Sequence, residues 1–248
     1  MPCNLTKGAV QMDNNAVNHG ICYIFGAAPV GNIPNIEPKE NDLIIAADGG
    51  LTAINSLGLT SNIVLGDFDS LGEVPKVECE LIRHPVEKDD TDMGLAVKTA
   101  FSKGFKRLFL FGGLGGERPD HTLANLQTLV YIAKNGGIGF LTDGKSCFTA
   151  LSGENTLIFP EGYTGGLSVF SAEGTAEGVT LENLYYPLEN ATLSGDFPLG
   201  VSNSFLPETE ENHGNSPKNA RISLTKGTLL IYFDCKNKSI NQYPKTKN

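Results

Sequence analysis

Acidic residues follow three predicted strands in the first half of the chain, at the point where each strand ends. Asp48 follows the predicted strand 43–47, Asp67-Phe68-Asp69 follows the strand 63–65, and Lys88-Asp89-Asp90-Thr91-Asp92 comes after the strand 81–82 and opens a helix. In an extended segment alternate side chains share a side, so Asp67 and Asp69 face the same way. Ligands of open α/β sheets bind beyond the carboxyl ends of the strands. Converging carboxylates there suit Mg²⁺, which leaves its other positions to phosphate oxygens and water.

Each of these acidic residues also has a purely structural interpretation. Asp90 or Thr91 would serve as a helix N-cap, and Asp48-Gly49 as a simple turn. Three acidic strand ends at one rim nevertheless favour a metal site, because carboxylates held close together without a cation would destabilise the fold.

A fourth strand end carries the glycine-rich segment Gly112-Gly113-Leu114-Gly115-Gly116-Glu117-Arg118-Pro119-Asp120-His121. Glycines let backbone N–H groups approach a phosphate closely, and the start of the following helix favours an anion. The Arg118 guanidinium is suited to a forked contact with phosphate. Because tight turns also use glycines, this segment supports a phosphate site only in combination with the acidic strand ends.

Residues 139–146 fit the G-x-x-x-x-G-K-[ST] pattern of nucleotide-binding loops. That pattern requires a strand before it and a helix after it. Here residues 138–141 are themselves expected to form a strand, and β-type residues follow Ser146. We therefore expect Asp143-Gly144 to form a turn and not a phosphate loop.

The elements that must position these residues change character near residue 145. Before it, short apolar runs are expected to form strands at residues 21–25, 43–47, 63–65, 81–82, 107–111 and 138–141, and helices are expected at 51–57, 91–102 and 122–134. This alternation predicts a Rossmann-like α/β domain over residues 1–145, a parallel sheet with helices on both faces.

Residues 146–248 show short β-type runs separated by turns and no convincing helix. These runs lie at 157–159, 167–170, 191–193, 222–224 and 229–233. They predict a small all-β sandwich as the second domain. The polar segment 236–248 is expected to be frayed.

Composition excludes several classes of partner. The chain has 248 residues and a formal net charge of −9, without tracts of Lys or Arg, so neither nucleic acid nor an anionic membrane surface is expected to bind. Residues 1–20 lack the apolar core of a signal peptide. The five cysteines are far apart and form no C-x-x-C pair, which is typical of reduced thiols in a cytoplasmic protein.

Taken together and in this order, the motifs resemble those of the thiamine pyrophosphokinase family, bacterial type. The resemblance covers residues 21–233 and is strongest in the first half. It implies an α/β domain followed by a β-sandwich, and a homodimer with active sites between subunits. It also implies transfer of the pyrophosphoryl group of ATP to the hydroxyl of thiamine, giving thiamine diphosphate and AMP, with Mg²⁺ as cofactor.

The resemblance gives the matching positions of the first half their roles. It implies that Mg²⁺ is held by Asp67, Asp69 and Asp92, with Asp48 close by. Positions that line the nucleotide and thiamine pockets are matched by Lys88, Asp89 and Thr91, and the pair in the glycine-rich loop by Arg118 and Asp120. Arg118 and Lys88 would then balance phosphate charge. The proton of the thiamine hydroxyl would pass to Asp120 or to a metal-bound carboxylate.

In the second half, Gly200-Val-Ser-Asn203 resembles a G-x-S-N stretch of the family whose serine contacts thiamine. This implies that Ser202 and Asn203 belong to the thiamine site. Tyr186 matches the position of a stacking aromatic residue, and its ring would face the cationic thiazolium. The alternative for Tyr186 is ordinary packing in a β domain.

Two other functions compete with this interpretation. An Asp-x-Asp pair followed by Asp89-Asp90 is also typical of magnesium phosphohydrolases with an aspartyl nucleophile. In that family the pair follows the first strand, whereas here it follows the third, and Leu71 stands where a Thr or Val is usual. The second competitor is a thiamine-binding sensor without turnover, but binding a cation does not require Asp67, Asp69, Asp92 and Arg118.

Overall fold

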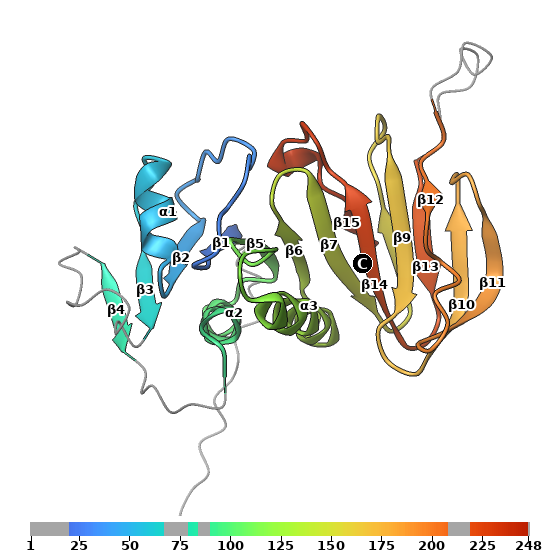
Figure 1. Ribbon diagram of the computed structural model, residues 1–248, viewed down its shortest axis with the longest axis horizontal. Helices are drawn as coiled ribbons and strands as arrows, with labels where there is room; N and C mark the ends of the chain where they lie inside the picture. The colour runs from blue at the N-terminus through green and yellow to red at the C-terminus, as the bar shows by residue number, and fades with distance from the viewer. Residues whose placement is uncertain (1–19, 67–78, 84–89, 208–218, 248) are drawn as a thin grey trace, which may run out of the picture.

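A ten-stranded sheet runs through the whole molecule. The computed structural model describes residues 20–66, 79–83, 90–207 and 219–247. Within these residues the strand order is β12-β9-β14-β7-β6-β5-β1-β2-β3-β4 (Figure 1). The parallel strands are β1 (Ile21–Phe25), β2 (Leu43–Ala47), β3 (Ile63–Gly66), β4 (Glu80–Arg83), β5 (Arg107–Phe111) and β6 (Ile138–Thr142).

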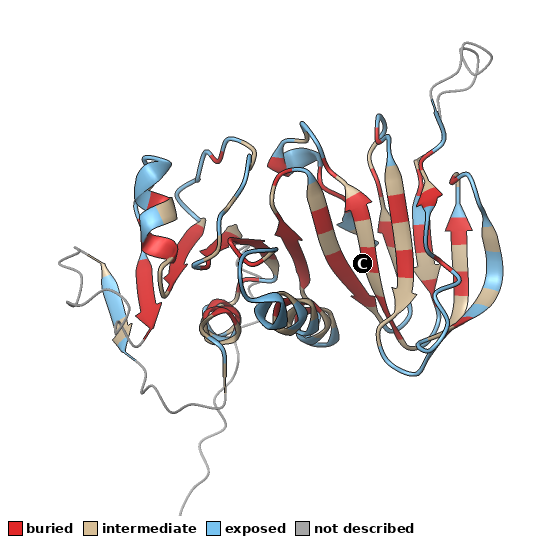
Figure 2. Ribbon diagram, viewed as in Figure 1, coloured by how far each residue is buried: buried red, intermediate tan, exposed pale blue. Residues whose placement is uncertain are grey.

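Helices cover both faces of this parallel part, as the sequence predicts. Helix α1 (Gly50–Ser56) buries Leu51 and Ile54 against one face. Helices α2 (Asp92–Ser102) and α3 (Pro119–Lys134) cover the other face with residues such as Val97 and Ile132. Strands covered on both faces are apolar throughout, and β2, β3 and β6 are buried at every residue (Figure 2).

The second half of the chain continues the same sheet. Strand β7 (Ser146–Ser152) pairs antiparallel with β6, and β14 (Thr228–Asp234), β9 (Gly166–Ser171) and β12 (Asn203–Ser204) follow in turn. A second sheet has the order β11-β10-β13-β8-β15. Its strands are β8 (Asn155–Ile158), β10 (Thr175–Glu182), β11 (Leu188–Ser194), β13 (Arg221–Leu224) and β15 (Lys245–Thr246).

The two sheets pack face to face and form the predicted β-sandwich. Buried and partly exposed residues alternate along β9 and β14, which gives the banding of Figure 2. Residues of the second sheet, Leu157 and Ile222 among them, share one hydrophobic core with Phe109 and Phe140 of the parallel strands. The core therefore crosses from the first half of the chain into the second.

Three details differ from the sequence-based expectation. Strands β7 and β10 were not predicted, although both extend over seven residues or more. Helix α3 begins at Pro119, three residues earlier than predicted, because proline suits the first helical position. The third difference is the C-terminal segment, described next.

The prediction of a frayed segment 236–248 is wrong over its described part. Tyr243 is fully buried, and its ring packs edge-on against Phe109 and Phe140 at centroid distances of 5.0 and 5.3 Å. Arg107 donates a hydrogen bond to the Pro244 carbonyl, and β15 pairs with β8. The prediction failed because it relied on the polar composition of the whole segment. Two residues of the segment, Ile240 and Tyr243, are buried and hold it against the core.

The turn expected at Asp143-Gly144 is confirmed. It joins β6 to β7, and Asp143 Oδ1 accepts hydrogen bonds from the backbone N–H groups of Lys145 and Ser146 at 2.9 and 2.8 Å. No helix follows, so these residues are not a phosphate loop. In the described part of the chain no helix has the length and apolar character needed to cross a membrane.

Candidate active site

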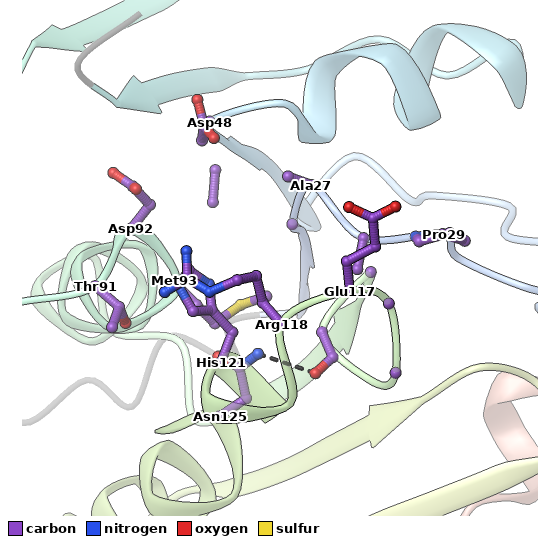
Figure 3. A pocket seen from close by; sticks show the side chains of 17 residues that line it. Ala27, Pro29, Asp48, Thr91, Asp92, Met93, Glu117, Arg118, His121 and Asn125 are labelled. Carbon is purple, nitrogen blue, oxygen red and sulfur yellow. Dashed lines mark hydrogen bonds between the residues drawn. The ribbon is translucent and has the colours of Figure 1, made fainter. Parts of the chain in front are cut away.

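A pocket of about 620 Å³ lies where the carboxyl ends of β1, β2 and β5 meet the N-termini of α2 and α3 (Figure 3). This volume is in the range of small-molecule sites. The pocket is lined by residues 26–29, 47–48, 91–93, 112–113, 115–118, 121 and 125. The structure therefore brings together Asp48, Thr91, Asp92 and Arg118 of the predicted site.

Asp48 stands directly after β2 in a left-handed backbone conformation, with φ of 50°. Its N–H donates to the Leu65 carbonyl at 2.8 Å, which fixes the turn beside the end of β3. Two residues later, α1 begins against the end of β1. A Cβ on Gly50 would lie 1.9 Å from the Phe25 carbonyl oxygen, so only glycine fits. The Asp-Gly-Gly motif thus places Asp48 at the pocket rim.

Thr91 and Asp92 form the N-terminus of α2. The Thr91 hydroxyl accepts a hydrogen bond from the Gly94 N–H at 3.1 Å, so the structural interpretation of Thr91 as N-cap is confirmed. Asp92 occupies the first helical position, where a negative charge is stabilised. Figure 3 shows Asp48 and Asp92 on one side of the pocket and Glu117 on the other.

Arg118 precedes α3 and forms a two-point ion pair with Asp120. Its Nε and Nη2 atoms donate to Oδ1 and Oδ2 at 3.0 and 2.7 Å. Hydrogen bonds from the guanidinium lower the pKa of Asp120 to about 2, and the same contact raises the pKa of Arg118. In this geometry Asp120 orients the guanidinium of Arg118, which lines the pocket.

The glycine-rich loop is held by two side chains of α3 that the sequence analysis did not single out. Buried Asn125 donates its amide N–H to the Gly113 carbonyl at 3.0 Å. Thr122 Oγ1 accepts from the Gly115 N–H at 3.1 Å. These residues are three positions apart, so they lie on one face of the helix.

The end of β1 is a further part of the pocket that the sequence analysis passed over. Ala27, Ala28 and Pro29 line it. Gly112 has φ of 64°, and a Cβ there would lie 2.4 Å from the Gly26 carbonyl oxygen. The two strand ends therefore meet backbone to backbone. This segment contains no acidic or basic residue, so nothing in its sequence indicated that it belongs to the site.

The predicted residues of the second half form a separate group. Asn203 is 6% exposed, and its Oδ1 accepts from the Tyr186 N–H at 2.9 Å while its Nδ2 donates to the Tyr186 carbonyl at 2.7 Å. Its side chain thus holds the Tyr186 backbone. Tyr186 is 61% exposed, and its ring meets that of Tyr185 edge-on at a centroid distance of 4.9 Å. Ser202 is exposed, with φ of 63°.

This second group does not line the pocket of the same chain. Asn203 belongs to β12, five strand positions from β5 in the sheet. Neighbouring strands lie roughly 4.8 Å apart, so the separation across the sheet is about 24 Å. One copy of the chain therefore keeps the two groups of predicted residues apart, and the expectation of a site between subunits stays a prediction.

Asp67, Asp69, Lys88 and Asp89 lie outside the described residues. Among the residues that the structure describes, no three His, Cys, Asp or Glu side chains gather at a point suited to a metal ion. The magnesium site therefore stays a prediction. The oxygen donors of Asp48 and Asp92 on one side of the pocket fit a hard cation such as Mg²⁺.

Strand-end carboxylates, a glycine-rich loop and an arginine at one pocket are typical of the class of α/β proteins that bind phosphate groups. Two family models match the chain, Thiamin pyrophosphokinase, catalytic domain, over residues 37–138 and Thiamin pyrophosphokinase, vitamin B1 binding domain, over residues 155–228. The chain belongs to the thiamine pyrophosphokinase family.

Relatives agree with this assignment. The thiamine pyrophosphokinase of Bacillus subtilis (strain 168) is 27% identical over 190 residues, which cover 74% of this chain and 88% of the relative. Its crystal structure superposes with a TM-score of 0.71 at 24% identity, covering 88% of this chain and all of that one. The structure from Candida albicans is similar in fold, with a TM-score of 0.66 at 12% identity over 89% and 91% of the two chains.

Proposed function

We propose that this chain is a thiamine pyrophosphokinase that transfers the pyrophosphoryl group of ATP to the hydroxyl of thiamine, giving thiamine diphosphate and AMP. The observation that carries the proposal is the pocket that joins Asp48 and Asp92 to Arg118 above a glycine-rich loop. In this proposal residues 1–145 hold ATP, and residues 146–248 hold thiamine.

The chemistry requires positioning and charge stabilisation more than covalent participation of the protein. The thiamine hydroxyl oxygen attacks the β-phosphorus of ATP. The bond from that phosphorus to the oxygen shared with the α-phosphorus breaks, and AMP leaves with this oxygen. Negative charge develops on the phosphate oxygens, where the Arg118 guanidinium, oriented by Asp120, would stabilise it.

Mg²⁺ is the expected cofactor. Asp67, Asp69 and Asp92 would hold the ion, and Asp48 would lie close to it. The ion would supply charge neutralisation of the phosphate oxygens. The proton of the thiamine hydroxyl would pass to Asp120 or to a carboxylate that binds the ion.

The residues that bind thiamine would come to this pocket from a second copy of the chain. Several large apolar side chains near Asn203 are exposed, namely Tyr185, Tyr186, Phe197, Leu199, Val201 and Leu206. An exposed apolar surface of this kind is typical of an interface. We propose a homodimer in which Tyr186 and Ser202 of one subunit complete the pocket of the other.

This arrangement predicts complementation between two inactive variants. Arg118→Gln impairs the pocket, and Ser202→Ala with Tyr186→Ala impairs the thiamine group. In a mixed dimer, one of the two sites combines the intact halves of both chains. Random exchange of subunits gives half mixed dimers, so about a quarter of the parental activity returns. If each chain forms its own complete site, mixing restores no activity.

The function is tested by incubating the purified protein with ATP, Mg²⁺ and thiamine and identifying the nucleotide product. We expect AMP, and only when thiamine is present. Release of ADP or phosphate without thiamine would favour the phosphohydrolase. Binding of thiamine without turnover would identify a sensor.

A further prediction concerns the loop supports on α3. We expect Asn125→Asp to raise the KM for ATP about tenfold with little change in the KM for thiamine, because a carboxylate would face the Gly113 carbonyl where an amide now donates. Thr122→Ser keeps the hydroxyl at Gly115 and should behave like the parent, whereas Thr122→Val should not. Equal increases in both KM values would argue against a role specific to the ATP loop.

We propose a cytoplasmic location. Cys22, Cys147 and Cys235 are buried free thiols, and burial raises the pKa of each. Such thiols are typical of a reducing compartment.

A further inference from the structure

A second cavity, of about 330 Å³, lies at the same edge of the ten-stranded sheet as the active-site pocket. Residues 32–35, 144–145 and 236–239 line it. Residues 144–145 follow the carboxyl end of β6, and residues 236–239 follow that of β14. Two antiparallel pairings, β6 with β7 and β7 with β14, make β14 run in the same direction as β6. Both segments therefore emerge at one edge, where ligands of α/β sheets bind.

Three lysines, Lys145, Lys236 and Lys238, line this cavity, and no Asp or Glu lines it. Within the described residues, neither Lys145 nor Lys236 forms an ion pair, although the chain as a whole carries a net charge of −9. The Lys238 ammonium donates to the Gly162 carbonyl and lies 4.7 Å from the centre of the Tyr163 ring. An excess of positive charge is thus held in a concave site.

The backbone that carries these lysines is fixed from several sides. The Lys145 carbonyl accepts from the Cys235 N–H at 2.8 Å, which ties the two lysine-bearing segments together. A Cβ on Gly144 would lie 1.9 Å from the Asn32 carbonyl oxygen, so the opposite wall packs directly on this turn. Two acidic residues close to these segments already accept hydrogen bonds: Asp143 accepts from backbone N–H groups of its own turn, and Glu37 accepts from the Asn35 amide at 3.0 Å.

We propose that this lysine cavity binds a small, multiply charged phosphate anion of the size of diphosphate. Its volume is at the lower end of the range for small-molecule sites. Lysine ammonium groups bind phosphate as point charges. Lys145 belongs to residues 139–146, which fit the pattern of a nucleotide-binding loop without forming one. The turn after β6 nevertheless places Lys145 at the proposed phosphate site, together with Lys236.

The cavity is distinct from the active-site pocket but shares a segment with it. Ala27–Pro29 line the pocket, and Asn32–Asn35 line the lysine cavity. Between them, a Cβ on Gly31 would lie 2.4 Å from the Asp143 carbonyl oxygen, so the segment is pressed against the turn after β6. The contact at Gly31 therefore separates the two sites.

The test is a calorimetric titration of the full chain with inorganic diphosphate, without Mg²⁺ or thiamine and at constant ionic strength. All proteins carry Arg118→Gln, which weakens binding of diphosphate in the active-site pocket. The titration measures binding alone and does not depend on turnover. We expect one diphosphate per chain. Adding Lys145→Gln and Lys236→Gln should weaken this binding about tenfold or more, because two charge-assisted contacts are lost.

A matched control adds Lys103→Gln and Lys226→Gln, which remove the same charge from sites outside the cavity. This control should change the affinity by less than about twofold, since remote surface charges are screened. Circular dichroism and thermal unfolding check that every variant is folded. The proposal would be overturned if the cavity variant and the control variant lost the same affinity for diphosphate. It would also be overturned if the Arg118→Gln protein bound no diphosphate. Either result leaves the transfer reaction of the natural chain to be judged separately.

Discussion

Replacing Asp92 by asparagine should lower the rate of pyrophosphoryl transfer about a hundredfold or more, the loss typical of one preorganised charge-stabilising group. Asp92 lies at the first position of α2 and lines the pocket. Asparagine keeps the size of the side chain and is tolerated at a helix N-terminus. The substitution therefore removes a carboxylate charge and changes little else.

Asp90 offers a matched control for this experiment. It lies two residues before Asp92, but its carboxylate binds the Lys98 ammonium at 2.6 and 2.7 Å, and it does not line the pocket. Asp90→Asn should therefore keep most of the parental kcat. The measurement is kcat over a range of Mg²⁺ concentrations, with thermal unfolding as a check of the fold. A parental rate for Asp92→Asn at saturating Mg²⁺ would remove Asp92 from the proposed metal site.

Replacing Tyr243 by alanine should lower the free energy of unfolding by about 3–5 kcal/mol, as other large-to-small changes of buried aromatic residues do. The ring is fully buried and contacts Phe109, Phe140 and Phe233. Removing it leaves a cavity between the parallel strands and the C-terminal segment. The measurement is urea unfolding followed by circular dichroism.

Tyr243→Phe separates packing from hydrogen bonding. This variant keeps the ring and loses only the hydroxyl, which lies 3.4 Å from Thr142 Oγ1. We expect a loss of about 1 kcal/mol, the usual size of one hydrogen bond. A similar small loss for Tyr243→Ala would contradict the buried position of the C-terminal segment and would support fraying.

Much of the fold could be predicted because the relevant strands are apolar on both faces. The strand Leu43–Ala47 and the acidic turn after it are evident in the sequence, and so is the helix stripe of Met93, Ala96 and Val97. Strand β10 was missed because Gly178, with φ of 66°, interrupts it at a bulge where the pairing register shifts. Such a strand lacks a regular alternation.

The candidate site was predictable where charge marks a strand end, as at Asp48 and Arg118. It was not predictable where a side chain acts on the backbone of a distant loop. The hydrogen bonds of Asn125 to Gly113 and of Asn203 to Tyr186 depend on loops that exist only in the folded chain. The assignment of Asn203 to the thiamine site stays a prediction, and its amide is bonded to the backbone of Tyr186, another residue of that predicted site.

The pairing of β6 with β7 limits how this enzyme can move. The ladder runs from Phe140–Thr149 to Thr142–Cys147, and it joins the two halves of the chain through their backbones. Swinging one half as a rigid body about a hinge would break these hydrogen bonds and open the core that both halves share. The distance between the active-site pocket and Tyr186 of the same chain is therefore fixed by the sheet. Any closure around the substrates would then come from loops at the sheet edge or, in the proposed homodimer, from sliding of one subunit against the other.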